Sequence, residues 1–279
     1  MTDTTVSAGF RAAARRRRLL VLLGQAVILV GFIGTWQIAS DTGFVDPLFF
    51  GSPTGVVARL ADWFVNGTAY GSFWFQIFVT LEEAAIGFVV GVFSGIFMGI
   101  LLGQVDYLSD VMNPYIKFLN AIPRIVLGSI FVMWLGLGLA AKAILAAVLV
   151  FFVVFFNAYQ GVRSVDPNLV ANIRILGGSR ADVIRQVIIP SAMTWIVASL
   201  HVALGFSIIG AIVGEILGAQ HGLGLVIKTA QNTFDSDGVF GCMFVIGMIV
   251  LGVEVLMTRI EKRLLAWRKP SSAENIQDV

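Results

Sequence analysis

The sequence is poor in charge and in the residue types that most enzymes use. Only 13% of its 279 residues are charged, about half the fraction of a soluble domain. The single cysteine, Cys242, lies inside an apolar run, which excludes an intrachain disulfide and a thiolate metal site. No G-x-x-x-x-G-K-S/T motif is present, so the chain has no P-loop for ATP hydrolysis. Nothing resembles a catalytic triad, a metal cluster or a nucleic-acid patch, and we predict a non-catalytic chain that binds no cofactor itself.

Long apolar runs are what the sequence has instead, and 57% of its residues are hydrophobic. Runs of about 20 residues have the length of a membrane-spanning helix. They lack the strict alternation of a transmembrane β-strand. We therefore predict an all-α polytopic membrane protein with about six transmembrane helices. The expected spans are residues 19–39, 77–103, 114–135, 140–158, 192–214 and 239–258, the third broken early by Pro114 and Pro123 and preceded by a short polar loop at 104–113.

The first apolar run follows four arginines at 15–18. This pattern also occurs in signal peptides, but the length of the run and the lack of a small-residue cleavage site favour an uncleaved span. Helical spacing of apolar residues within 41–75 predicts a short helix at the membrane interface, with Trp63 and Trp74 as interfacial aromatics. The expected divisions are a basic N-terminus 1–18, a first span with outer segment 19–75, a core 76–260 and a tail 261–279.

The distribution of lysine and arginine predicts the topology. Residues 1–18, 104–124, 161–190 and 259–279 hold 16 of the 19 basic residues. Basic residues concentrate on the cytoplasmic side of a membrane protein. We therefore expect both termini in the cytoplasm, in a multi-pass protein of the bacterial cytoplasmic (inner) membrane. The polar loop 161–190 then faces the cytoplasm.

A glycine repeats every fourth residue through the second expected span. This spacing forms a groove that spirals slowly around the helix and suits close crossing of a second helix. Packing within one subunit and a seam between two copies are both compatible with the pattern; we favour the first. The glycines are Gly87, Gly91, Gly95, Gly99 and Gly103.

The loop between the fourth and fifth spans reads as two short helices joined at Gly177 and Gly178. Asp166 can cap the first helix, and Ser179 with Asp182 forms the pattern of a capping box for the second. An apolar stripe is expected on each helix, and Pro190 marks the end of the second helix or a bend. Two amphipathic helices between membrane spans make a platform, which suggests a docking partner.

Polar residues inside the spans are candidates for a translocation pathway. Each has a structural alternative, which we favour: an interfacial anchor, an interhelical hydrogen bond, a packed histidine or a local cap. The pathway candidates are Trp134, Asn157, His201 and Glu215. We further expect Glu82 and Glu83 to be a solvated or interfacial pair, and Glu254 to pair with Arg259.

The loop resembles the EAA loop of permease subunits of bacterial ABC importers. Gly177 fits the glycine of that motif, Val187 its aliphatic position and Ile189-Pro190 its closing pair. The run Leu-Gly-Gly-Ser-Arg at 176–180 is similar to the common Leu-Gly-Ala-Ser-Arg. Ala-Asn-Ile at 171–173 stands where the family has Glu-Ala-Ala, which puts in doubt a carboxylate contact from position 171 but not the docking helix.

The resemblance extends from about residue 80 to 268. Pro123 followed by Trp-Leu-Gly-Leu-Gly at 134–138 is similar to the family's Pro…Trp-Phe-Gly-Ile-Gly stretch. Gly-Glu at 214–215, Gly-Leu-Gly at 222–224 and the ending at 263–268 are similar as well. Together these motifs point to the nitrate/sulfonate/taurine branch of type I ABC importer permeases.

The resemblance implies a permease for a small organic or inorganic anion. Its implied partners are two ABC ATP-binding subunits that bind ATP and Mg²⁺, a second permease copy (a homodimer), and a periplasmic or lipid-anchored substrate-binding protein. The residues it implies for docking the ATPase are Asp166, Asn172, Arg174, Gly177, Gly178, Ser179, Arg180, Asp182 and Pro190.

Two alternatives remain open at this point. One is an importer of a vitamin precursor or an aromatic acid that works by the same mechanism. The other is a stand-alone channel or secondary carrier, a class in which helices are often broken at mid-membrane. The second is disfavoured because Pro123 is expected too near the inner end to break a span at that depth.

Overall fold

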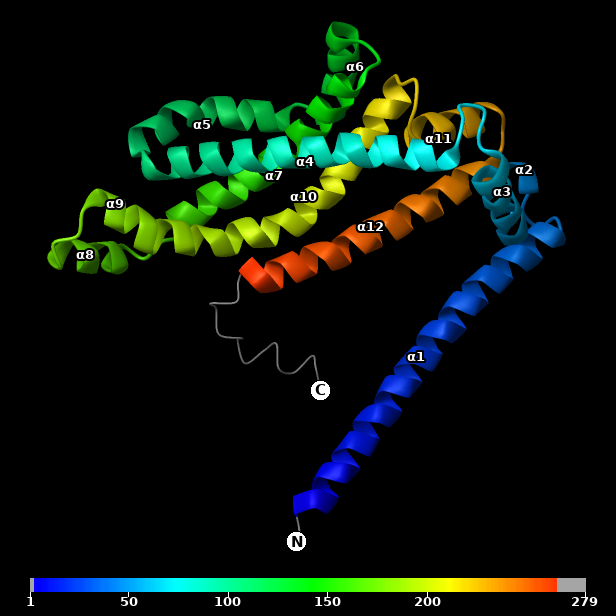
Figure 1. Cartoon of the computed structure of the whole chain (residues 1–279), viewed down its shortest axis with the longest axis horizontal. Helices are drawn as coiled ribbons and strands as arrows, with labels where there is room; N and C mark the ends of the chain where they lie inside the picture. The colour runs from blue at the N-terminus through cyan, green and yellow to red at the C-terminus, as the bar shows by residue number, and fades with distance from the viewer. Residues whose placement is uncertain (1–2, 265–279) are drawn as a thin grey trace.

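The computed structural model describes residues 3–264, and its named elements are all helical (Figure 1). Five helices are long and apolar enough to cross a membrane, and one sharply bent pair brings the number to six. The all-α prediction with about six spans is therefore confirmed. Most of the expected tail, 265–279, lies outside the described residues. The elements are α1 (Asp3–Asp41), α2 (Pro47–Phe50), α3 (Pro53–Asn66), α4 (Phe73–Gln104), α5 (Asp106–Ala121), α6 (Arg124–Leu135), α7 (Leu139–Arg163), α8 (Pro167–Ile175), α9 (Arg180–Val183), the π-helix η1 (Ile184–Ile188), α10 (Ile189–Leu217), α11 (Leu223–Asn232) and α12 (Ser236–Leu264).

The centre of the bundle is the pair α4 and α7, which meet along the glycine stripe. All five glycines of the stripe are buried. A Cβ at Gly91 would lie 2.6 Å from the Ala147 carbonyl oxygen, and one at Gly99 would lie 2.6 Å from the Ala158 Cβ. Backbones this close leave no room for any side chain but hydrogen. The stripe therefore packs within one chain and is not a seam between copies.

Helix α10 packs on both α4 and α7, and α12 packs along α10. Gly210 of α10 lies against the backbone of Ala146, so close approach is used on two sides of α7. Leu204, Ile208 and Met257 form a buried apolar cluster between α10 and α12. These contacts make α4, α7 and α10 the rigid core on which other elements rest.

One end of the bundle, which we call the α11 end, carries α2, α3 and α11 (Figure 1). The expected interfacial helix in 41–75 is present as α3, but Trp63 is buried against Phe73 in an apolar cluster that includes Leu223. An ion pair of 3.0 Å joins Arg59 of α3 to Asp235. Between the fifth and sixth expected spans the chain forms α11, whose apolar residues Leu223, Val226 and Ile227 pack on this cluster.

The third span differs from its prediction in two ways. Residues 104–113 are not a loop, because α5 begins at Asp106, and Pro114 lies inside that helix without ending it. The break falls at Pro123 alone, where α5 and α6 meet at 86°. Proline has no backbone N–H and disfavours a helical residue before it, which ends α5 at Ala121.

Helix α1 leaves the bundle and runs away from the other spans (Figure 1). Its contacts with the other described helices come from its last turns. Trp36 donates its indole N–H to the Phe50 carbonyl (3.2 Å), and Ser40 donates to the Gly51 carbonyl (3.1 Å). The apolar part of α1 is exposed along its length, as expected of a lipid-facing span.

Candidate functional site

The polar loop 161–190, for which the sequence predicts a docking role and which we call the coupling loop, lies at the opposite end from α11, which we call the α8 end (Figure 1). Asp166 accepts a hydrogen bond of 2.8 Å from the Asn168 N–H, and Pro167 occupies the first turn of α8. The helix ends at Ile175, and Gly177 follows with φ of +81°. Glycine adopts this left-handed conformation without the steric cost that other residues meet. The turn between the two helices therefore depends on Gly177.

The second helix of the loop begins with the predicted capping box. The Ser179 N–H donates to the Asp182 carboxylate at 2.8 Å, and the Asp182 N–H donates back to the Ser179 hydroxyl at 3.3 Å. This helix does not end at Pro190. It continues through η1 into α10, where the Ile189 N–H bonds to the Ile184 carbonyl five residues earlier. The wider π-helical turn lets the chain pass a proline that lacks an N–H.

The two helices of the loop differ in burial. Val183 and Val187 of the second are buried, as an apolar stripe predicts. Helix α8 has no buried residue, and Ile175 and Leu176 at its end are 82% and 86% exposed. The predicted apolar stripe of α8 is therefore only partly covered: Val170 and Ile173 are half-buried, while Leu169 and Leu176 are exposed. Asn172, Arg174 and Arg180 are also at the surface.

A groove of about 670 Å³ separates α8 from the end of α4. Arg174 lines it, together with Gly103, Asp106 and Ile188. Where the loop leaves α7, two contacts join α7 to α5: an ion pair of Arg163 with Asp106, and a 2.7 Å hydrogen bond between Ser109 and Tyr159. The platform is therefore fixed to the bundle at its base and open at its tip.

The four pathway candidates are not brought together. Trp134 is largely exposed at the end of α6, and Asn157 donates its amide N–H to the Val153 carbonyl one turn earlier in α7. His201 lies between Glu254 and Glu261 of α12. Glu254 thus pairs with His201 and not with Arg259, because α10 and α12 pack side by side at this height.

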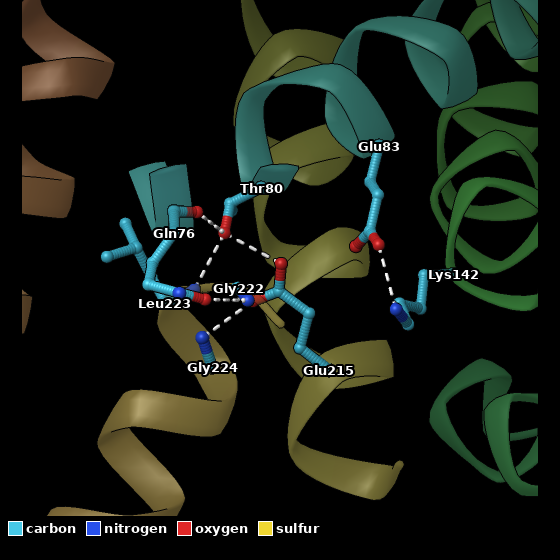
Figure 2. Close-up of polar contacts among 8 residues, drawn as sticks. All are labelled: Gln76, Thr80, Glu83, Lys142, Glu215, Gly222, Leu223 and Gly224. Atoms are coloured by element: carbon cyan, nitrogen blue, oxygen red, sulfur yellow. Dashed lines mark hydrogen bonds and ion pairs between the residues drawn. The ribbon is translucent and has the colours of Figure 1, made fainter. Parts of the chain in front are cut away.

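Glu215, the fourth candidate, is fully buried in a hydrogen-bond network at the α11 end (Figure 2). Its carboxylate accepts from the Thr80 hydroxyl at 2.7 Å and from the Gly224 N–H at 2.6 Å. Thr80 accepts from the Leu223 N–H, and Gln76 accepts from the Gly222 N–H, both at 2.8 Å. The first N–H groups of a helix have no partner within it. Here side chains of α4 and α10 supply those partners for α11.

A buried ion pair lies beside this network (Figure 2). Lys142 of α7 donates to Glu83 of α4 at 2.9 Å, and both side chains are almost fully buried. The sequence interpretation of Glu83 as solvated or interfacial is therefore wrong, although Glu82 is exposed. A signal was available: Glu83 is four residues before Gly87 and shares the helix face that carries the glycine stripe.

Comparison with known proteins identifies the arrangement. Residues 91–266 match the family model of the binding-protein-dependent transport system inner membrane component. An aliphatic sulfonates transport permease protein of Bacillus subtilis is 27% identical over 236 residues, covering 85% of this chain and 84% of that protein. The riboflavin transport system permease protein of Chloroflexus aurantiacus is 29% identical over 245 residues, covering 88% and 90%.

A solved structure shares the fold. The structure of the MetNI methionine ABC transporter in an inward-facing conformation superposes with a TM-score of 0.58 at 18% identity, covering 68% of this chain and 96% of that one. The family match covers well over half of the residues of the chain, and the several apolar spans agree with it. The chain belongs to the binding-protein-dependent transport family as a multi-pass permease component of the bacterial inner membrane.

Proposed function

We propose that this permease forms the translocation pathway of an importer whose energy comes from a separate ATP-binding subunit docked on the coupling loop. The observation that carries the proposal is the tip of α8, where Ile175 and Leu176 stand exposed on a platform fixed at its base. Exposed apolar side chains grouped on a built platform mark a protein contact surface. The chain has no P-loop of its own, so the nucleotide and Mg²⁺ would be bound by the partner.

The remaining partners follow from the family. Its members are components of binding-protein-dependent systems, so an external substrate-binding protein would deliver the solute at the α11 end. Two ATP-binding subunits would dock at the α8 end, on the cytoplasmic side, and a second copy of this chain would complete the pathway. Both termini would then be cytoplasmic, in agreement with the distribution of basic residues.

The proposed substrate is a small anion of the sulfonate type. It is supported by the similarity to the sulfonates permease over 85% of this chain and by the branch to which the sequence motifs point. The similarity to the riboflavin permease, 29% over 245 residues, supports a vitamin-type substrate as the second candidate. A stand-alone carrier is not favoured, because the matched family consists of components of binding-protein-dependent systems.

The test is reconstitution of the chain with the ATP-binding subunit and binding protein encoded beside it. We expect ATP hydrolysis that rises with loaded binding protein, and uptake of radiolabelled ethanesulfonate into vesicles that stops without ATP. Riboflavin uptake in its place would select the second candidate. Uptake by the purified chain alone, without ATP, would refute the proposal.

A variant tests the docking role directly. Gly177→Pro cannot adopt φ of +81°, because proline fixes φ near −65°. We expect it to abolish uptake and ATPase association while leaving membrane insertion intact. Gly177→Asn is the matched control, since asparagine tolerates the left-handed conformation. Normal transport by Gly177→Pro would count against this role for the loop.

A further inference from the structure

The break between α5 and α6 lies halfway along the bundle and not at its end. The Arg124 guanidinium stacks on the Phe152 ring, 4.7 Å from the ring centroid. Phe152 is close to the middle of the 25-residue α7. Ser109 contacts Tyr159 nearer the α8 end of α7, and a Cβ at Gly128 would meet Leu145 nearer the opposite end. The expectation that Pro123 and Arg124 lie at the inner membrane surface is therefore wrong.

Arg124 is a cation at this depth without a carboxylate partner among the described residues. The other basic side chains with partners in the bundle are neutralised: Lys142 by Glu83 and Arg163 by Asp106. Arg124 donates to the neutral Asn120 amide oxygen, and its Nε is buried with no hydrogen-bond partner in the described chain. Arg124 as a whole is half-buried, so part of the side chain remains accessible. A cation within the spans is costly unless paired, and a lone one marks a pathway by default.

The surroundings of the guanidinium suit a small anion. Arg124 is the first residue of the 12-residue α6, whose positive end adds to the side-chain charge. Half-helices that begin at mid-membrane direct this end at anionic groups in transporters. Arginine presents a planar fork of N–H donors that matches the oxygen geometry of carboxylates and similar anions, and Nε belongs to that fork.

We propose that Arg124 is an anion-binding residue halfway along the translocation pathway, where it holds the sulfonate or carboxylate group of the passing solute. This inference rests on the proposed import function and adds a residue and a substrate class to it. The Phe152 ring would hold the guanidinium in place, and the bend at Pro123 would present it to the solute.

The first experiment measures ethanesulfonate uptake by the reconstituted complex. Arg124→Gln keeps a side chain that can form hydrogen bonds but removes the charge. We expect uptake to fall about ten- to a hundredfold, the rate equivalent of one hydrogen bond to a charged group. ATP hydrolysis stimulated by loaded binding protein should change less than uptake. Arg124→Lys should lose part of the rate, because lysine keeps the charge without the fork. Lys117→Gln is the matched control, because Lys117 is an exposed cation of α5.

The outcomes separate this inference from the function on which it rests. Uptake by Arg124→Gln at the wild-type rate, or equal losses of uptake and ATP hydrolysis, would overturn the role of Arg124. Wild-type uptake of riboflavin but not ethanesulfonate would overturn the anion class and leave the ATP-driven import function standing.

A second measurement needs no transport. Arg124→Cys should react with the sulfonate-bearing reagent 2-sulfonatoethyl methanethiosulfonate in vesicles, and excess ethanesulfonate should slow the reaction. The unsubstituted chain is the control, because its single cysteine, Cys242, is fully buried. An unreactive Arg124→Cys would show that water and anions do not reach this position, and would refute the proposal even if the import function failed its own test.

Discussion

The two ends of the bundle differ in which residues they bury and which they expose. At the α11 end, Glu83, Lys142 and Glu215 are buried and paired. At the α8 end, Ile175 and Leu176 are more than four-fifths exposed. Each arrangement is unfavourable by itself. A buried charge must be paired, and an exposed apolar side chain lacks the stabilisation that burial would give.

The difference indicates which end is completed within the chain and which is not. Most polar groups at the α11 end find their partners on α4, α7, α10 and α11 of the same chain; within the described residues, Glu83 Oε2 is the exception. The α8 platform has its helix caps and its base contacts in place, but its apolar tip lacks a partner. The comparison predicts that substitutions at the α11 end act on folding, and that those at the α8 tip act on assembly.

The largest expected effect on folding is at the buried ion pair. Lys142→Met leaves the Glu83 carboxylate buried without its counter-charge, which should cost about 3–5 kcal/mol of stability. Unfolding of the purified chain can be followed with a thiol-reactive dye, because the single cysteine, Cys242, is buried in the folded state. The double variant Glu83→Leu with Lys142→Met removes both charges and should recover most of the loss. An unchanged melting curve for Lys142→Met would refute the pairing.

The next largest effect is expected at the glycine stripe. Gly91→Ala places a methyl group 2.6 Å from the Ala147 carbonyl oxygen, and overpacking of this kind costs about 1–3 kcal/mol. Gly205→Ala is the matched control, since a Cβ there meets nothing within 4 Å. We expect a lower melting temperature and yield for Gly91→Ala only. Equal behaviour of the two variants would mean that α4 and α7 do not approach this closely.

A smaller effect is expected at the start of α9. Asp182→Ala removes the carboxylate that accepts from the Ser179 N–H but keeps Ser179 as the N-cap, so the loss should be smaller than that of the cap itself. Because α9 continues into α10, only the first turn should fray. Hydrogen exchange at residues 179–183 should speed up, by less than about fivefold, the value for losing a whole N-cap. Gln186→Ala, at an exposed position four residues further on, should leave these amides unchanged.

These local features were predictable because they depend on nearby residues. Asp166 and Asp182 cap helices within three positions of themselves, and Gly177 ends α8 by its own backbone freedom. The glycine stripe has a period that identifies a packing face in a single helix. Rules of this range account for the span count and for both helix starts in the coupling loop.

The remaining features depend on contacts between distant parts of the chain. Glu83 is buried because Lys142, 59 residues away, lies opposite it. The short spacing of polar residues at 104–113 is typical of a loop, yet Ser109 there contacts Tyr159 and α5 folds back along the bundle. The depth of Arg124 likewise follows from its contact with Phe152 and not from its position between two prolines. Sequence alone specifies neither which helices meet nor at what height.

The smallest effect on folding, and the sharpest test of the comparison, is expected at the platform tip. Leu176→Ser replaces a side chain that is 86% exposed, so the stability of the isolated chain should change by less than about 0.5 kcal/mol. If the ATP-binding subunit covers this residue, its loss should weaken association by about 1.5–3 kcal/mol, roughly ten- to a hundredfold. Phe44→Ser is the matched control, because Phe44 is also 86% exposed but lies at the α11 end. The affinity of the purified ATP-binding subunit for the solubilised chain is measured for both variants. Equal affinities for the two variants would show that the exposed apolar residues at the α8 tip do not contact the ATP-binding subunit. The proposed difference between the two ends would then be refuted.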